Sequence, residues 1–268
     1  MANPEPKLMR IISSALSRSF ILLFALNVFG GSARGQSAAD MIAKGDQLDQ
    51  QLKAQEALDY YLPASKLEPN NVDLLVRIAR QYRHLMTETS SKKEKLRLGL
   101  ISLESAQRAA DLAPKNAEAQ LSPAISYGKM LPYMSSKDQV TCAPKIKESV
   151  DRTLALDPRN DNAWHILGRW NRVLADVNIV KRMLAQALYG NLPKTTNEDA
   201  LKCLRKAIEI NPNRLIHYIE LGRIYAQMGN KEEASEYIHK GLSMPDKEAD
   251  DPEMKEIGRA TLQKLGVN

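Results

Sequence analysis

Four helix-like stretches of the chain end in the same way, on an apolar residue, one further residue and then a proline. These prolines are Pro69, Pro114, Pro158 and Pro212. Proline has no amide hydrogen to continue a helix, and it pushes the preceding residue out of the α region, so each one predicts a helix end. The chain must then turn and start another helix, which restricts the fold to a succession of helical hairpins.

Small or apolar residues also recur at fixed offsets before each proline. Positions twelve, eight and five residues earlier fall on one stripe of a helix, where small side chains let a neighbouring helix come close. The residues at these positions are Ala57, Tyr61 and Ala64; Ser102, Ala106 and Ala109; Ile146, Val150 and Thr153; and Ala200, Leu204 and Ala207. The stripe indicates that these helices pack against neighbours along the chain.

The residues after Pro212 show a repeat motif. Tyr218, Leu221, Gly222 and Tyr225 follow in an order that resembles the tetratricopeptide repeat, a helix-turn-helix unit of about 34 residues. The prolines are 45, 44 and 54 residues apart, so the units contain extra residues. Such hairpins bury their apolar faces only by stacking. The sequence therefore predicts an all-α, tetratricopeptide-like α-solenoid of four to five helix-turn-helix units with inserted helices, over residues 36–268.

Residues 1–35 differ in composition from the rest of the chain. Three basic residues precede an apolar run from Phe20 to Phe29, and small residues follow as far as Gly35. This is the layout of a secretory signal peptide, and a run of ten residues is short for a membrane-spanning helix. We expect an exported protein, periplasmic or secreted, if the segment is cleaved. An organelle transit peptide and an uncleaved membrane anchor are the alternatives.

The charge of the chain is modestly positive. The formal net charge is +6, and residues 1–35 supply +3 of it. One local excess remains outside that segment, formed by Lys92, Lys93, Lys95 and Arg97. This basic patch predicts either a dock for an acidic partner or the solvated start of a helix. No aromatic residue is interleaved with the lysines, so we expect no nucleic-acid partner.

The sequence contains no catalytic or cofactor-binding motif. It has no His-Glu-x-x-His run, no Gly-x-Ser-x-Gly elbow and no glycine-rich loop between a strand and a helix. The four histidines lack a second ligand at metal-binding spacing. Cys142 and Cys203 are expected to be separate core residues rather than a disulfide. We therefore expect a non-enzymatic protein with no cofactor and no metal.

An apolar pattern recurs in the long interval before Pro212. Val177, Val180, Leu184 and Leu188 share one face of a predicted helix. This extra amphipathic helix either fills the core or closes an apolar groove that holds a peptide or an apolar ligand.

Several strings in the same region resemble one protein family. Residues 165–170, 187–190, 198–202 and 211–213 read HILGRW, ALYG, EDALK and NPN, and they resemble the regulator of microtubule dynamics family. The resemblance implies a helical-repeat fold and a binding role rather than catalysis. It also implies microtubules or phospholipid as ligands and a cytoplasmic, microtubule-associated location, whereas an exported protein would not meet a microtubule.

Three binding functions are consistent with this sequence. The first is a protein-interaction scaffold that presents the concave face of its first helices to a partner. Candidate contacts, chosen by repeat position, are Tyr82, Arg169, Arg172, Arg223 and Gln227. The second is binding or transfer of a lipid or other apolar ligand in the predicted apolar groove. The third is microtubule binding through the basic patch.

Overall fold

The computed structural model of the protein describes residues 36–176 and 194–267. These residues form eleven α-helices, one short 3₁₀ helix and no strand. The helices are α2 (Ala38–Asp49), α3 (Ala54–Leu67), α4 (Val72–Glu88), α5 (Lys92–Leu112), α6 (Ala117–Met130), α7 (Ser136–Leu156), α8 (Asp161–Ala175), α10 (Asn197–Ile210), α11 (Leu215–Met228), α12 (Lys231–Ser243) and α13 (Asp251–Leu265), with η1 at Leu131–Tyr133. The predicted all-α class is confirmed.

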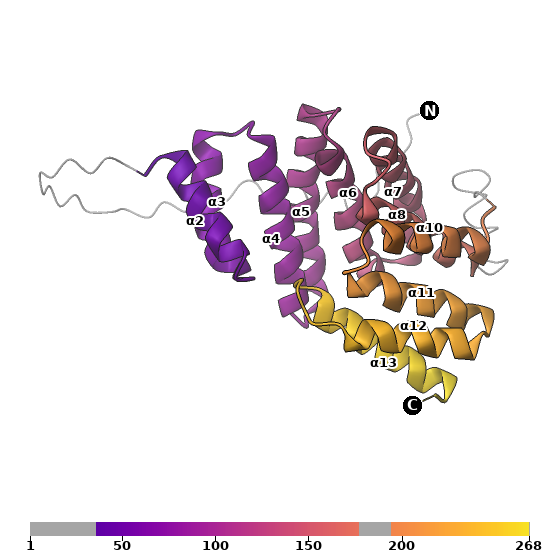
Figure 1. The fold of residues 1–268 in the computed structure, drawn as a ribbon. Coiled ribbons are helices and arrows are strands. Elements are labelled where there is room, and N and C mark those ends of the chain that lie inside the picture. The colour runs from indigo at the N-terminus through magenta and orange to yellow at the C-terminus, as the bar shows by residue number, and fades with distance from the viewer. Residues whose placement is uncertain (1–35, 177–193, 268) are drawn as a thin grey trace, which may run out of the picture. The chain divides into compact units, whose positions relative to one another are not determined.

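The helices pack as antiparallel neighbours in chain order. The pairs α2–α3, α4–α5, α6–α7, α8–α10 and α11–α12 form hairpins, and α13 packs on α11 and α12. Each hairpin also contacts the next one through α3–α4, α5–α6, α7–α8 and α10–α11. Figure 1 shows this progression from α2 to α13. The described residues therefore form five stacked hairpins and a final helix, as the repeat pattern predicts.

The prolines end helices where the sequence predicts. The helices α3, α5, α7 and α10 each stop two residues before a proline. The residue between helix and proline still donates its N–H to the carbonyl four residues earlier, but its ψ of 68 to 91° lies outside the α region. Asn71, Asn116 and Asn160 then begin α4, α6 and α8, because each side chain accepts the N–H of the residue three positions later.

The predicted stripe forms the contact between helices. None of its twelve side chains is more than 2 % exposed. At the crossing of α8 and α10, a Cβ added to Gly168 would lie 1.7 Å from Leu204 Cδ2, so any other residue would force Leu204 to move. The stripe lies on the second helices α3, α5, α7 and α10. The first helix of each hairpin therefore keeps one face free to line a shared surface.

Some sequence predictions concern buried thiols or residues outside the described ranges. Cys142 and Cys203 are free thiols buried in different clusters, which confirms their separate packing. The leader or anchor at residues 1–35 and the apolar groove of Val177, Val180, Leu184 and Leu188 lie outside the described residues. Within the described ranges, no helix combines the length and apolar character that crossing a membrane requires.

Candidate functional site

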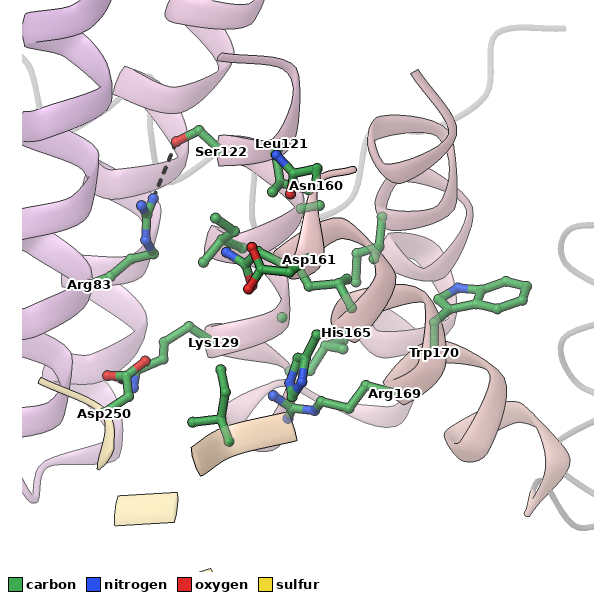
Figure 2. A pocket seen from close by; sticks show the side chains of 18 of the residues that line it. Arg83, Leu121, Ser122, Lys129, Asn160, Asp161, His165, Arg169, Trp170 and Asp250 are labelled. Atoms are coloured by element: carbon green, nitrogen blue, oxygen red, sulfur yellow. Dashed lines mark hydrogen bonds and ion pairs between the residues drawn. The ribbon is translucent and has the colours of Figure 1, made fainter. Parts of the chain in front are cut away.

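A cavity of about 1180 Å³ lies between the first helices of the hairpins. Residues of α4, α6, α7, α8 and α11 line it, together with residues 247–250 just before α13. In Figure 2, Arg83 enters from α4 on one side, and His165 and Arg169 enter from α8 on the other. The repeat stacking therefore brings distant parts of the sequence to one site.

The central helices give the cavity an apolar floor. The apolar residues that they contribute are Leu121, Ala124, Ile125, Val140, Ile146 and Ile166. Trp170 points to the other side of α8 in Figure 2, and its indole N–H donates to the carbonyl of Ala143 at 3.0 Å. The floor can bury apolar side chains of a ligand, while the polar groups stand on the walls.

The α4 wall holds a buried cation without a hydrogen-bonded carboxylate. Arg83 is 7 % exposed, and its guanidinium donates to the hydroxyls of Ser122 at 3.3 Å and Ser126 at 3.1 Å. Burial and the neighbouring Arg80 cation lower the pKa of Arg83 to about 10, so it stays charged at neutral pH. Hydroxyls hydrogen-bond this buried cation without neutralising it, so an anionic ligand can stabilise it further.

An ion pair joins α6 to the start of α13 at the edge of the cavity. Lys129 Nζ donates to Asp250 at 2.6 Å and to Glu253 at 3.0 Å. Asp250 also accepts from the Thr87 hydroxyl at 3.1 Å. Burial alone would raise the pKa of Asp250, but Lys129 holds it below its usual value. The one cation and two carboxylates fix the cavity edge and leave no unpaired cation there.

The opposite wall is built around a fully buried carboxylate. Glu220 on α11 is 0 % exposed and accepts from Arg172 at 2.7 Å and from Arg223 at 2.6 Å. Burial opposes its ionisation, but Arg223, Arg172 and Arg169 lower the pKa of Glu220 to about 2. Gln227 accepts from Arg172 Nη1 and donates to the carbonyl of Arg172. This network ties α8 to α11.

Two buried histidines, His165 and His217, form a hydrogen-bonded histidine pair beside the cavity. Their Nδ1 atoms are 3.1 Å apart, and His217 Nε2 lies 3.0 Å from Asp161 Oδ2. Asp161 also accepts from Arg214 and Asn211. Burial opposes ionisation of Asp161, but the hydrogen bonds from His217 and Arg214 hold its pKa well below the usual range. Burial lowers the pKa of both histidines.

The structure brings four of the five candidate contact residues together. Arg172, Arg223 and Gln227 surround Glu220, and Arg169 lines the cavity. Tyr82 is half-buried on α4, where it packs against two core clusters and does not line the cavity. Arg172 and Gln227 therefore join α8 to α11, Arg223 pairs with Glu220 within α11, and Arg169 and Arg172 are the two that line the cavity.

Sequence reasoning missed Arg83, Glu220 and the histidine pair. The sequence does contain a pattern that could have found Arg83. Arg83 and Arg172 both lie fourteen residues after one of the four prolines that end the repeat helices, here called repeat prolines. Arg80, Arg169 and Arg223 likewise stand eleven residues after one. No comparable register links the histidines, which lie seven and five residues after their prolines.

The basic patch is partly engaged within the structure. Lys95 donates to the Tyr133 hydroxyl at 3.0 Å, and Arg97 pairs with Glu94 at 2.6 Å. Lys92 and Lys93 are exposed at the start of α5. The patch thus presents fewer unpaired cations than the sequence count indicates.

The polar groups do not assemble a metal centre. Within residues 36–176 and 194–267, no group of three or more His, Cys, Asp or Glu side chains is placed to hold a metal ion. The histidine pair and Asp161 are hydrogen-bonded to one another instead.

The fold and cavity define a tetratricopeptide-like helical-repeat protein. A solved thermophilic tetratricopeptide-repeat protein of Thermus thermophilus aligns with a TM-score of 0.59 at 17 % identity, covering 85 % of this chain and 100 % of that one. At this identity the likeness shows the fold alone.

The family follows from the sequence comparisons. The model of the regulator of microtubule dynamics protein 1-3 family matches residues 41–266, so the chain belongs to that family, and the predicted resemblance is confirmed. Bos taurus regulator of microtubule dynamics protein 3 is 27 % identical over 81 % of this chain and 46 % of its own length. Caenorhabditis elegans regulator of microtubule dynamics protein 1 is 25 % identical over 72 % of this chain and 84 % of its own length. The chain thus spans less than half of the bovine relative.

Proposed function

We propose that the protein is a non-enzymatic scaffold that binds an acidic segment of a protein partner in the cavity between α4, α6, α8 and α11. Helical-repeat proteins present extended binding surfaces of this kind. The observation that carries the proposal is Arg83, a charged guanidinium on the cavity wall whose hydrogen-bond partners are hydroxyls.

The pairing of charged residues around the cavity supports an acidic ligand. Most cations in the walls already have carboxylates: Lys129 pairs with Asp250, and Arg214 pairs with Asp161 and Glu248. Arg83 has none at hydrogen-bond distance. A partner carboxylate placed there would form a charge-assisted hydrogen bond in a shielded site, where it is stronger than at the surface.

Microtubules are the proposed partner, because the relatives carry that function in their names. Tubulin has acidic tails, which fit a cavity whose Arg83 cation has no carboxylate at hydrogen-bond distance. The cavity is a better candidate than the basic patch, because Lys95 and Arg97 of the patch already have partners.

The binding experiment uses a fluorescein-labelled glutamate-rich peptide and anisotropy. Arg83→Met is expected to weaken binding about tenfold or more, because a hydrogen bond between charged groups is lost. Arg83→Lys keeps the charge and should retain part of the affinity. A double substitution, Lys92→Ala with Lys93→Ala, is the control and should leave binding nearly unchanged. Each variant is first checked for an unchanged thermal melting profile.

Two outcomes would contradict the proposal. Binding that survives Arg83→Met but is abolished by the double lysine substitution would move the site to the basic patch. Co-sedimentation with microtubules is the second readout. Equal binding to intact microtubules and to microtubules trimmed of their acidic tails would remove the tails as the ligand.

The apolar floor supports a second candidate, a lipid or other apolar ligand. Leu121, Ile125 and Ile146 can pack against hydrocarbon. Native mass spectrometry of the freshly purified protein tests this candidate. A bound lipid that the glutamate-rich peptide displaces would favour it, and a ligand-free mass would argue against it.

A further inference from the structure

The hydrogen bonds of the histidine pair determine where its protons lie. Burial keeps the pKa of both side chains below the usual 6.5, so both imidazoles are neutral at neutral pH. A neutral imidazole has one N–H donor and one acceptor nitrogen. The ionised Asp161 carboxylate only accepts, so His217 Nε2, at 3.0 Å from it, carries the proton.

The remaining positions follow from this assignment. His217 Nδ1 is then a bare acceptor, and the donor in the 3.1 Å contact must be the Nδ1–H of His165. The Nε2 of His165 is consequently a bare lone pair. Asp161 and His217 thus fix His165 as a hydrogen-bond acceptor.

This acceptor stands on the cavity wall beside Arg169, whose positive charge also acts on the buried Glu220. His165 lines the cavity, and none of the described residues hydrogen-bonds its Nε2. Arg169 is one helical turn further along α8, and Figure 2 shows both side chains on the same side of that helix. Among the described residues, Arg169 has no hydrogen-bond or ion-pair partner. The wall therefore presents an acceptor next to N–H donors.

We propose that His165 and Arg169 bind the primary carboxamide of an Asn or Gln side chain in the partner segment. The carboxamide N–H donates to His165 Nε2, and its carbonyl oxygen accepts from the Arg169 guanidinium. The inference rests on the proposed function for its occupant, a protein segment in the cavity.

The positions of the donor and the acceptor favour a primary carboxamide over a carboxylate or a backbone peptide group. A carboxylate can accept from Arg169, but it has no hydrogen for the bare Nε2 of His165. A trans peptide group points its N–H and its carbonyl in opposite directions. A primary carboxamide directs one N–H and its oxygen to the same side. His165 and Arg169, four residues apart on α8, lie on one face of the helix with Cα atoms about 6 Å apart, so one small group can contact both side chains.

The test uses acetamide as the probe and histidine-selective ¹⁵N NMR as the readout. Long-range ¹H–¹⁵N spectra distinguish a protonated from a bare ring nitrogen, and His165→Asn assigns the signals. We expect a bare Nε2 in His165 and a protonated Nε2 in His217. Acetamide should shift the His165 Nε2 resonance in a saturable way, and the exposed His239 serves as the internal reference. N-methylacetamide and N,N-dimethylacetamide should shift it far less.

Each contrary result is decisive. A protonated His165 Nε2 in the free protein overturns the inference, as does an acetamide response no larger than that of N,N-dimethylacetamide. An equal response to N-methylacetamide would exclude the primary carboxamide in favour of a backbone amide. Arg169→Met should reduce the acetamide response severalfold, and an unchanged response removes Arg169 from the site. If these tests fail while the glutamate-rich peptide still binds through Arg83, the inference fails and the proposed function stands.

Discussion

Replacing Glu220 with glutamine tests how the α8–α11 wall is stabilised. The carboxylate is fully buried between Arg172 and Arg223, at 2.7 and 2.6 Å. Glutamine keeps the shape of the side chain but removes its charge. Two guanidinium groups would then face each other without an anion at hydrogen-bond distance, and removing one partner of a buried ion pair usually destabilises a protein strongly.

The magnitude follows from the pKa of Glu220. It falls from an ordinary 4.5 to about 2, and each pKa unit corresponds to about 1.4 kcal/mol. Ionised Glu220 therefore contributes about 3 kcal/mol to the free energy of unfolding at neutral pH. Because its pKa is lowered on folding, this contribution is present above pH 4.5 and is lost as the pH falls toward 2. Urea unfolding followed by circular dichroism at pH 7 and at lower pH measures it.

The wild type and Glu220→Gln should therefore differ by about 3 kcal/mol at pH 7 and converge below pH 4.5. Glu209→Gln is the matched control, because its pair with Lys206 is exposed and should contribute nothing measurable. A Glu220→Gln protein as stable as Glu209→Gln at pH 7 would refute the reasoning. So would a difference that stays constant at all pH values.

Three further outcomes are expected. Gly222→Ala should destabilise the protein by about 1 to 3 kcal/mol, because the added Cβ would lie 2.8 Å from the Ala234 carbonyl of α12. Gly128→Ala, with nothing within 4 Å, should be neutral or slightly stabilising in the same urea titration. Burial raises the pKa of the thiols of Cys142 and Cys203 to about 11, so neither should react with iodoacetamide until the protein unfolds. Rapid labelling of the native protein would contradict this. Folding lowers the pKa values of the histidine pair and holds both imidazoles neutral, so the free energy of unfolding should fall as the pH drops below 6.5. The fall should be at most about 1.4 kcal/mol per pH unit for each imidazole. An unchanged urea midpoint between pH 7 and 5.5 would contradict this.

The fold could be predicted because its determinants are local in sequence. Each repeat proline ends a helix through its own backbone chemistry, and the stripe before it has a period that only a helix places on one face. Gly168 and Gly222 occupy the same register, ten residues after a repeat proline, and both permit a close helix crossing. These features need no knowledge of distant contacts.

The candidate site was predictable only in part, because its chemistry depends on distant pairings. Repeat position singled out Arg172 and Arg223, but not Glu220, whose single carboxylate on α11 accepts from both. His165 and His217 are 52 residues apart and meet only after α8 and α11 have packed. The arginine register was readable in the sequence, whereas the burial that makes Arg83 a binding candidate was not.

Site-specific photo-crosslinking tests most directly whether the cavity holds the partner segment. A benzophenone amino acid at Ile125, on the cavity floor, is compared with one at Leu156, an exposed residue at the end of α7. We predict that the glutamate-rich peptide crosslinks to the protein labelled at Ile125 and that unlabelled peptide suppresses this product. Crosslinking from Leu156 alone, with none from Ile125, would contradict the account.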